Sequence, residues 1–184
     1  HTAHVVLLDG RGVQRNGYYP SPIVRDALEI DSGLVFTSEP FTEPMALVGQ
    51  FGGQLHVRLN KRDVDLSIVL YELLADGRAM QLAYQIGRAS HAADMSTRRL
   101  LVPGEWTALP IPRARMTGRQ LAPGSRLVVV VDVIQDAMHQ VNHGTGGDVS
   151  AESVADAGAP LRLGLRGDSG VRLALQAGGG LAEA

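Results

Sequence analysis

Alternation of apolar and polar side chains with a period of two recurs along the chain and constrains its fold more than any other feature. In residues 54–59, Gln, His and Arg alternate with Leu, Val and Leu, so one face can be buried while the other meets water. Gly, Pro, Asn and Asp separate these short runs, and the 3.6-residue period of a helix is rarely matched. The sequence therefore predicts an all-β domain.

Eight or nine such strands are expected, a number typical of a β-sandwich or barrel. Residues 66–71 and 126–134 are apolar on both faces, which favours central positions in a sheet. Asp76-Gly77 predicts a hairpin turn, because this pair tolerates positive φ. Further strands are expected at 80–84, 98–102, 106–111, 161–165 and 171–175. The prolines of 106–111 predict an edge strand, and residues 149–157 predict one or two helical turns with Ser150 as a cap.

Composition argues against several functional classes. With 17 Lys+Arg against 19 Asp+Glu the net charge is −2, whereas nucleic-acid binders usually gather a basic excess. The longest apolar run, residues 127–131, is far shorter than the roughly 18 residues of a membrane helix. The 184 residues suit one domain that needs no disulfide, and the chain has no cysteine. We divide it into an extended arm (1–32), a β domain (33–176) and a Gly-rich flexible tail (177–184).

Catalytic motifs are hard to find. Residues 167–171 (GDSGV) come closest to the G-x-S-x-G elbow that carries the nucleophile of an α/β-hydrolase. The last glycine is missing and no helix pattern follows, so we interpret Ser169 as part of a tight turn between the last two strands.

Three other groups could carry a site. His139 and His143 have the i, i+4 spacing of metal ligands on a helix, but the glycines after His143 favour a loop with exposed or hydrogen-bonded imidazoles. Residues 144–147 are glycine-rich but do not form a phosphate-binding P-loop motif. Asp63 and Asp65 could bind calcium or share a proton. The alternative, which we favour, is that they accept hydrogen bonds from turn amides or pair with Arg58 and Arg62.

Sugar binding on such a fold would usually need aromatic platforms. The chain has 1 Trp, 4 Tyr and 3 Phe, and we expect Trp106 to anchor an edge or the core rather than to stack on a sugar.

Several motifs, in this order, resemble the C-terminal β domain of the cocaine esterase and X-Pro dipeptidyl-peptidase family, including acylase-like and α-amino acid ester hydrolase-like members. They lie at residues 33–44 (GLVFTSEPFTEP), 63–66 (DVDL), 76–78 (DGR), 103–105 (PGE), 121–127 (LAPGSRL) and 142–147 (NHGTGG). Residues 18–24 (YYPSPIV) resemble the linker that leaves the catalytic domain of acylase-like members.

The resemblance implies a jelly-roll β-sandwich of the galactose-binding-like type. It also implies that the arm is a linker from an α/β-hydrolase domain, which in the family supplies the catalytic triad. No catalytic residue, metal or cofactor can be carried over to this chain. The expected role is non-catalytic: packing on the catalytic domain, shaping the substrate pocket and supporting oligomer contacts. The alternative is a stand-alone module that binds a glycan or peptide.

Overall fold

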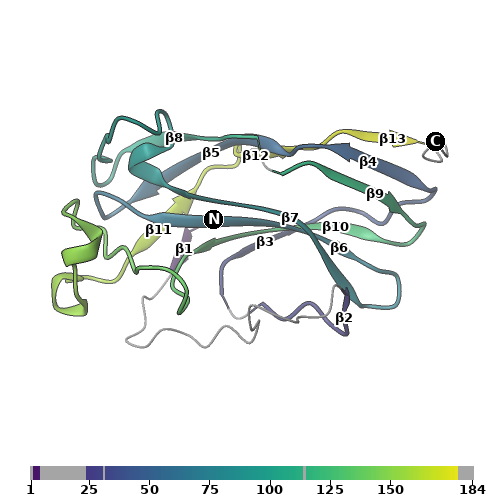
Figure 1. Ribbon diagram of the computed structural model, residues 1–184, viewed down its shortest axis with the longest axis horizontal. Coiled ribbons are helices and arrows are strands. Elements are labelled where there is room, and N and C mark those ends of the chain that lie inside the picture. Colours follow the sequence, from purple (N-terminus) through teal and green to yellow (C-terminus); the bar gives the residue numbers. More distant parts are fainter. Residues whose placement is uncertain (1, 5–23, 31, 114, 178–184) are drawn as a thin grey trace.

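The computed structural model describes residues 2–4, 24–30, 32–113 and 115–177, and their strands pack as two antiparallel layers (Figure 1). The lower layer has the order β2-β7-β6-β10-β3, and the upper layer combines β1-β11-β5-β12 with β13-β4-β9. The strands are β1 (Thr2–His4), β2 (Val24–Arg25), β3 (Leu34–Thr37), β4 (Met45–Gly49), β5 (Gly52–Leu59), β6 (Asp65–Leu73), β7 (Ala79–Arg88), β8 (Trp106–Ile111), β9 (Thr117–Leu121), β10 (Arg126–Val133), β11 (Arg162–Leu165), β12 (Gly170–Arg172) and β13 (Leu175–Ala177).

The core fills the space between the layers, and period-two alternation decides which side chains enter it. On β5, Leu55, Val57 and Leu59 are buried while the residues between them face outward. Leu66, Ile68 and Leu70 of β6 belong to the same core from the opposite layer. The predicted all-β sandwich is confirmed.

Several local predictions are also confirmed. β6 lies between β7 and β10, and β10 lies between β6 and β3, as their two apolar faces require. Asp76-Gly77 turns the β6–β7 hairpin, with φ of +89° at Gly77. β8 pairs with β5 along the edge opposite β11 and β12, so it is an edge strand as its prolines predict.

Two predictions about the strands are wrong in detail. Residues 98–102 form no strand, because the amide of Leu101 bonds the carbonyl of Arg62 at 2.8 Å in a loop contact rather than in a ladder. The last predicted strand is divided into β12 and β13, which pair with β5 and β4.

The predicted helical turns at 149–157 are two 3₁₀ turns, Val149–Ala151 and Val154–Asp156, and a third, Ala89–His91, follows β7. Asp148, not Ser150, caps the first of the predicted pair, because its carboxylate accepts the Ser150 amide. Within the described ranges no helix is long and apolar enough to cross a membrane.

Parts of the predicted arm join the sheets. β1 pairs with β11 and β2 pairs with β7. After β2, residues 26–30 run along the bottom of the molecule in Figure 1. The motif at residues 18–22 and the tail from 178 onward lie outside the described residues.

Candidate functional site

Two of the sequence candidates, the Asp63/Asp65 pair and the loop at residues 142–147, meet at the end of the sandwich where β6 begins. Asp63 has a fully buried side chain, and both of its carboxylate oxygens are occupied. Oδ1 accepts the amides of Val64 (2.9 Å) and Ser90 (3.0 Å), and Oδ2 accepts the Ser90 hydroxyl (2.7 Å) and the Arg98 guanidinium (3.3 Å). This carboxylate therefore fastens the chain after β7 to the chain before β6.

Asp65 makes the second half of this cluster. Arg88 donates to its two oxygens in a bidentate pair at 2.8 Å each, and Asn142 donates to Oδ1 at 2.9 Å. The hydrogen bonds that Arg88 donates to Asp65 raise the pKa of the Arg88 guanidinium above its ordinary value. Asn142 thereby ties the long connection between β10 and β11 to the lower sheet.

The expectation that Asp63 and Asp65 bond to turn amides and arginines is correct, but the expected arginines are wrong. Arg88 pairs with Asp65 because the β6–β7 register sets the two residues directly opposite each other. Arg58 faces outward from the other layer and stacks on Trp106. Every oxygen of the two carboxylates accepts a donor, so the contacts do not favour the calcium alternative.

The glycine loop is folded onto itself rather than open to a phosphate. Its amides at Gly144 and Gly147 donate to Asn142 and Thr145, and the amide of His143 donates to Glu152. Gly144 has φ of +75°, and a Cβ there would lie 2.7 Å from the Asp63 carbonyl oxygen. Glycine is therefore required where the loop crosses the carboxylate cluster.

The two histidines of the i, i+4 pair do not converge. His143 is 7% exposed, and its Nδ1 has no hydrogen-bond partner among the described residues. His139 is exposed and contacts the Asp136 carboxylate at 2.8 Å. The described part of the chain holds no group of three or more side chains able to ligate a metal.

Ser169 lies in the predicted turn, beside an unpredicted Asp168–His56 contact. His56 Nδ1 lies 2.8 Å from Asp168 Oδ1, but the Ser169 hydroxyl accepts the backbone amide of His56, and the imidazole Nε2 contacts Gln54 at 3.0 Å. The serine is therefore not joined to the imidazole as a nucleophile is to its base. Hydrogen bonds from Arg166, and then from His56, lower the pKa of Asp168 to about 2.

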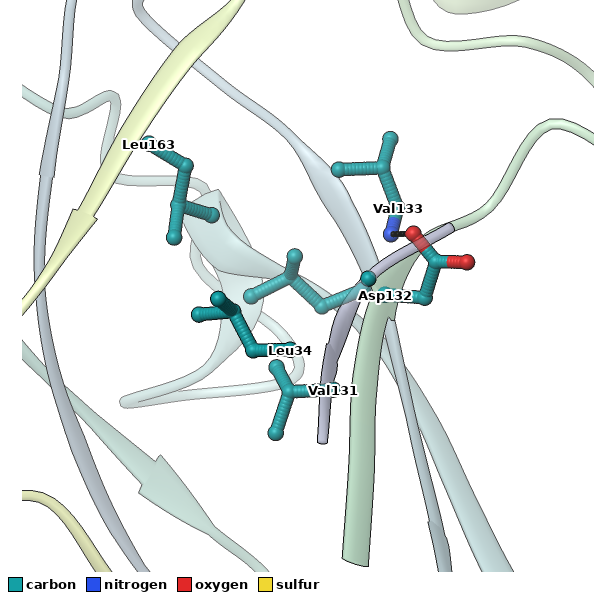
Figure 2. A pocket seen from close by; sticks show the side chains of 7 residues that line it. Leu34, Val131, Asp132, Val133 and Leu163 are labelled. Carbon is teal, nitrogen blue, oxygen red and sulfur yellow. Dashed lines mark hydrogen bonds between the residues drawn. The ribbon is translucent and has the colours of Figure 1, made fainter. Parts of the chain in front are cut away.

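One hollow lies next to the candidate site, and a much smaller one lies inside the sandwich. The larger, about 450 Å³, opens beside the carboxylate cluster and is lined by Asp65, Ile86, Gly87, Arg88, His91, Met95, Ile134, His139 and Gln140. The smaller, about 10 Å³, lies between apolar side chains such as Leu34, Val131 and Leu163 (Figure 2). It can hold about one water and is a packing gap.

The outer face of the lower layer carries a row of apolar side chains. Strand register aligns Val35, Val130, Val69 and Tyr84 in one row across β3, β10, β6 and β7. Val128 and Val130 are buried but do not belong to the core cluster, consistent with their facing away from the other layer. Val35, at the end of the row, is 47% exposed. We call this row the valine face.

Comparison with known proteins gives consistent results. Residues 2–157 match the model of the X-Pro dipeptidyl-peptidase C-terminal non-catalytic domain. The cocaine esterase of Rhodococcus sp. (strain MB1 Bresler) is 26% identical over 126 residues, which cover 68% of this chain and 22% of that protein.

Solved structures show the same fold. An α-amino acid ester hydrolase matches with a TM-score of 0.76 and 19% identity, over 84% of this chain and 28% of that one. An aminopeptidase from a marine sediment Thaumarchaeota archaeon matches with a TM-score of 0.77 and 17% identity, over 96% and 33%. The chain thus spans between about a fifth and a third of the length of these relatives.

Proposed function

The chain belongs to the family of X-Pro dipeptidyl-peptidase C-terminal non-catalytic domains, and we propose that it packs on an α/β-hydrolase domain of the same parent protein, where it helps to enclose the substrate pocket. The parent would hydrolyse esters or amides, and the domain would also support contacts between subunits. The relatives are longer hydrolases, of which this chain matches a minor part.

The observation that carries the proposal is the valine face. A sheet with one face on the core and the other in water shows apolar residues on one side only, whereas a sheet covered on both sides is apolar on both. Val35, Val69 and Val130 make the lower layer apolar on its outer side as well. Ile86, which is 41% exposed, also projects from this side and lines the 450 Å³ cleft.

The outer face of β5 in the upper layer is polar, in contrast to the valine face. The outward residues of β5 are Gln54, His56 and Arg58, which are suited to water. On the lower layer, the exposed side chains of Val35 and Ile86 extend the apolar row to a surface that a permanent partner domain would cover.

The test is reassembly from two chains. The coding region of the parent protein would be used to express the catalytic domain separately, and its binding to this chain would be measured by isothermal titration calorimetry. We expect Val35→Asp and Ile86→Asp to weaken binding at least tenfold.

Val48→Asp is the matched control, because Val48 is a similarly exposed valine (42%) on β4 of the other layer. Equal losses in all three variants would contradict docking through the valine face. Esterase activity of this chain alone that disappears in Ser169→Ala would contradict the non-catalytic role.

A further inference from the structure

The outer face of the upper layer gathers positive charge in a chain whose net charge is −2. Arg58 and Trp106 are direct neighbours across β5 and β8, and Gly164 of β11 lies on the other side of Arg58. Arg162 and Arg172 are the exposed, outward residues of the adjoining strands β11 and β12. We call Arg58, Arg162, Arg166, Arg172 and Trp106 the arginine face.

Arg58 is held in place without being neutralised. Its guanidinium carbon lies 5.0 Å from the centroid of the Trp106 ring, and the guanidinium has no hydrogen bond or ion pair among the described residues. An arginine stacked on an aromatic ring keeps the N–H groups at its edge available for a planar oxyanion. Stacking thus prepares Arg58 for a bidentate contact at a low entropic cost.

Arg166 provides an internal comparison. Its guanidinium lies 5.8 Å from the same ring, but it donates to both oxygens of Asp168 at 2.7 Å. The Asp168 carboxylate therefore already accepts the hydrogen bonds that Arg166 could otherwise donate to an external oxyanion. Arg58, Arg162 and Arg172 have no such carboxylate among the described residues.

The residues on this face restrict the kind of partner. Small residues lie beside Trp106 on this face: Ala108, two residues on in its own strand, and Gly164, whose Cβ position would lie 3.6 Å from the indole. Single-stranded nucleic acids need several aromatic rings for base stacking, and protein interfaces need a cluster of apolar anchors. One tryptophan, already stacked with two arginines, supplies neither.

We propose that the arginine face binds an acidic polysaccharide, through carboxylate or sulfate groups that contact Arg58 and Arg162, which lies two residues before the Gly164 paired with Arg58. The site is separate from the valine face, so it holds whether or not the chain docks on a hydrolase domain. Binding weakens as salt rises, because the contacts are between exposed charges.

The proposal can be tested with the 184-residue chain and four immobilised probes: heparin, alginate, neutral dextran and single-stranded oligo-dT. We expect binding to heparin, alginate or both, and none to dextran. Heparin alone would identify sulfate as the recognised group, and alginate alone would identify carboxylate. Arg58→Gln should weaken binding at least tenfold. Asp168→Asn should strengthen it several-fold, because it frees Arg166.

Arg115→Gln is the matched control, since Arg115 stacks on Tyr84 at the same 5.0 Å away from this face and its loss removes the same charge. It should change the affinity less than threefold. Equal losses for Arg58→Gln and Arg115→Gln would overturn the proposal, as would absence of binding to both acidic polysaccharides or tighter binding to oligo-dT.

Discussion

The two ends of β6 each bury a carboxylate, but they stabilise the sandwich in different ways. At the beginning of the strand, Asp65 and the preceding Asp63 have donors on all four oxygens, from three separate segments of the chain. At its far end, Glu72 is fully buried and bonds Arg119 of β9 through Oε2 at 2.7 Å, whereas Oε1 has no partner among the described residues. One end is a saturated network, and the other is a single ion pair between the layers.

The difference shows why equal burial does not mean equal dependence on one partner. A buried charge is costly unless it is compensated, and removing the partner leaves the whole cost in place. Asp63 and Asp65 share their compensation among several donors, so the loss of one leaves others. Glu72 accepts from one side chain, Arg119, among the described residues. The far end of β6 should therefore lose more stability than the near end when a donor is removed.

The largest expected effect is at the Glu72 end. Arg119→Met should lower the free energy of unfolding by about 3–5 kcal/mol, because it leaves the Glu72 charge buried and unpaired. Urea denaturation followed by circular dichroism would measure it. The double variant Glu72→Met/Arg119→Met should recover most of the loss, since the charge and its partner are both gone. A double variant as unstable as the single one would show that packing, and not the charge pair, stabilises the far end of β6.

Replacing each carboxylate by its neutral amide should reverse this order, so that the loss of unfolding free energy is larger at the Asp63 end than at the Glu72 end. Asp63→Asn should cost about 2–3 kcal/mol, because an amide nitrogen replaces an oxygen that accepts from Ser90 and Arg98. Glu72→Gln should cost about 1 kcal/mol, because the amide nitrogen can take the place of the oxygen without a partner while the other oxygen keeps Arg119. Equal costs in the same urea titration would contradict the distinction between a saturated and an unsaturated carboxylate.

A smaller and more local effect is expected where Asn142 joins the network. Asn142→Ala removes its bonds to Asp65 and Gly144, and should lower the protection of amides in residues 142–152 by about 1–2 kcal/mol. Hydrogen exchange would measure this, with Gln140→Ala as the control because Gln140 is exposed in the same connection. If protection fell equally in both variants, the hydrogen bonds of Asn142 would not be what stabilises this connection.

The smallest effect concerns Asp168, whose carboxylate is exposed, unlike the buried carboxylates at the two ends of β6. We expect the Asp168 carboxyl to titrate in an NMR experiment with a pKa of about 2. A lowered pKa means that the ion pair with Arg166 favours the folded turn above the ordinary Asp pKa near 3.9, and that this contribution is lost as the pH falls through about 2. Arg166→Gln should move the titration upward. An unchanged midpoint in that variant would assign the shift to another group.

Much of the fold could be predicted because the signals are local. Alternation at residues 54–59 and 66–71 locates strands and assigns faces, and Asp76-Gly77 locates their turn. The strand predicted at 98–102 is wrong, although its composition is suitable, because its amides bond loop residues.

The candidate site was predicted only in part. Its members Asp63, Asp65 and the loop at 142–147 stood out as separate motifs. Nothing in the sequence joins Asp65 to Asn142, 77 positions away. Glu72 gave no signal at all, because a polar residue on the alternating core face looks like an ordinary exception until Arg119 is placed across the layers.

Periodicity in the sequence by itself determined that this chain is all-β, which strands are central, and where most turns fall, because backbone periodicity and turn chemistry act over a few residues; the choice of a sandwich over a barrel came from the family resemblance. Only the tertiary structure decided which arginine meets which carboxylate, and that Arg58 stands unpaired on an outer face. Those pairings depend on strand register and on how the layers stack, which bring together residues that are far apart in the chain.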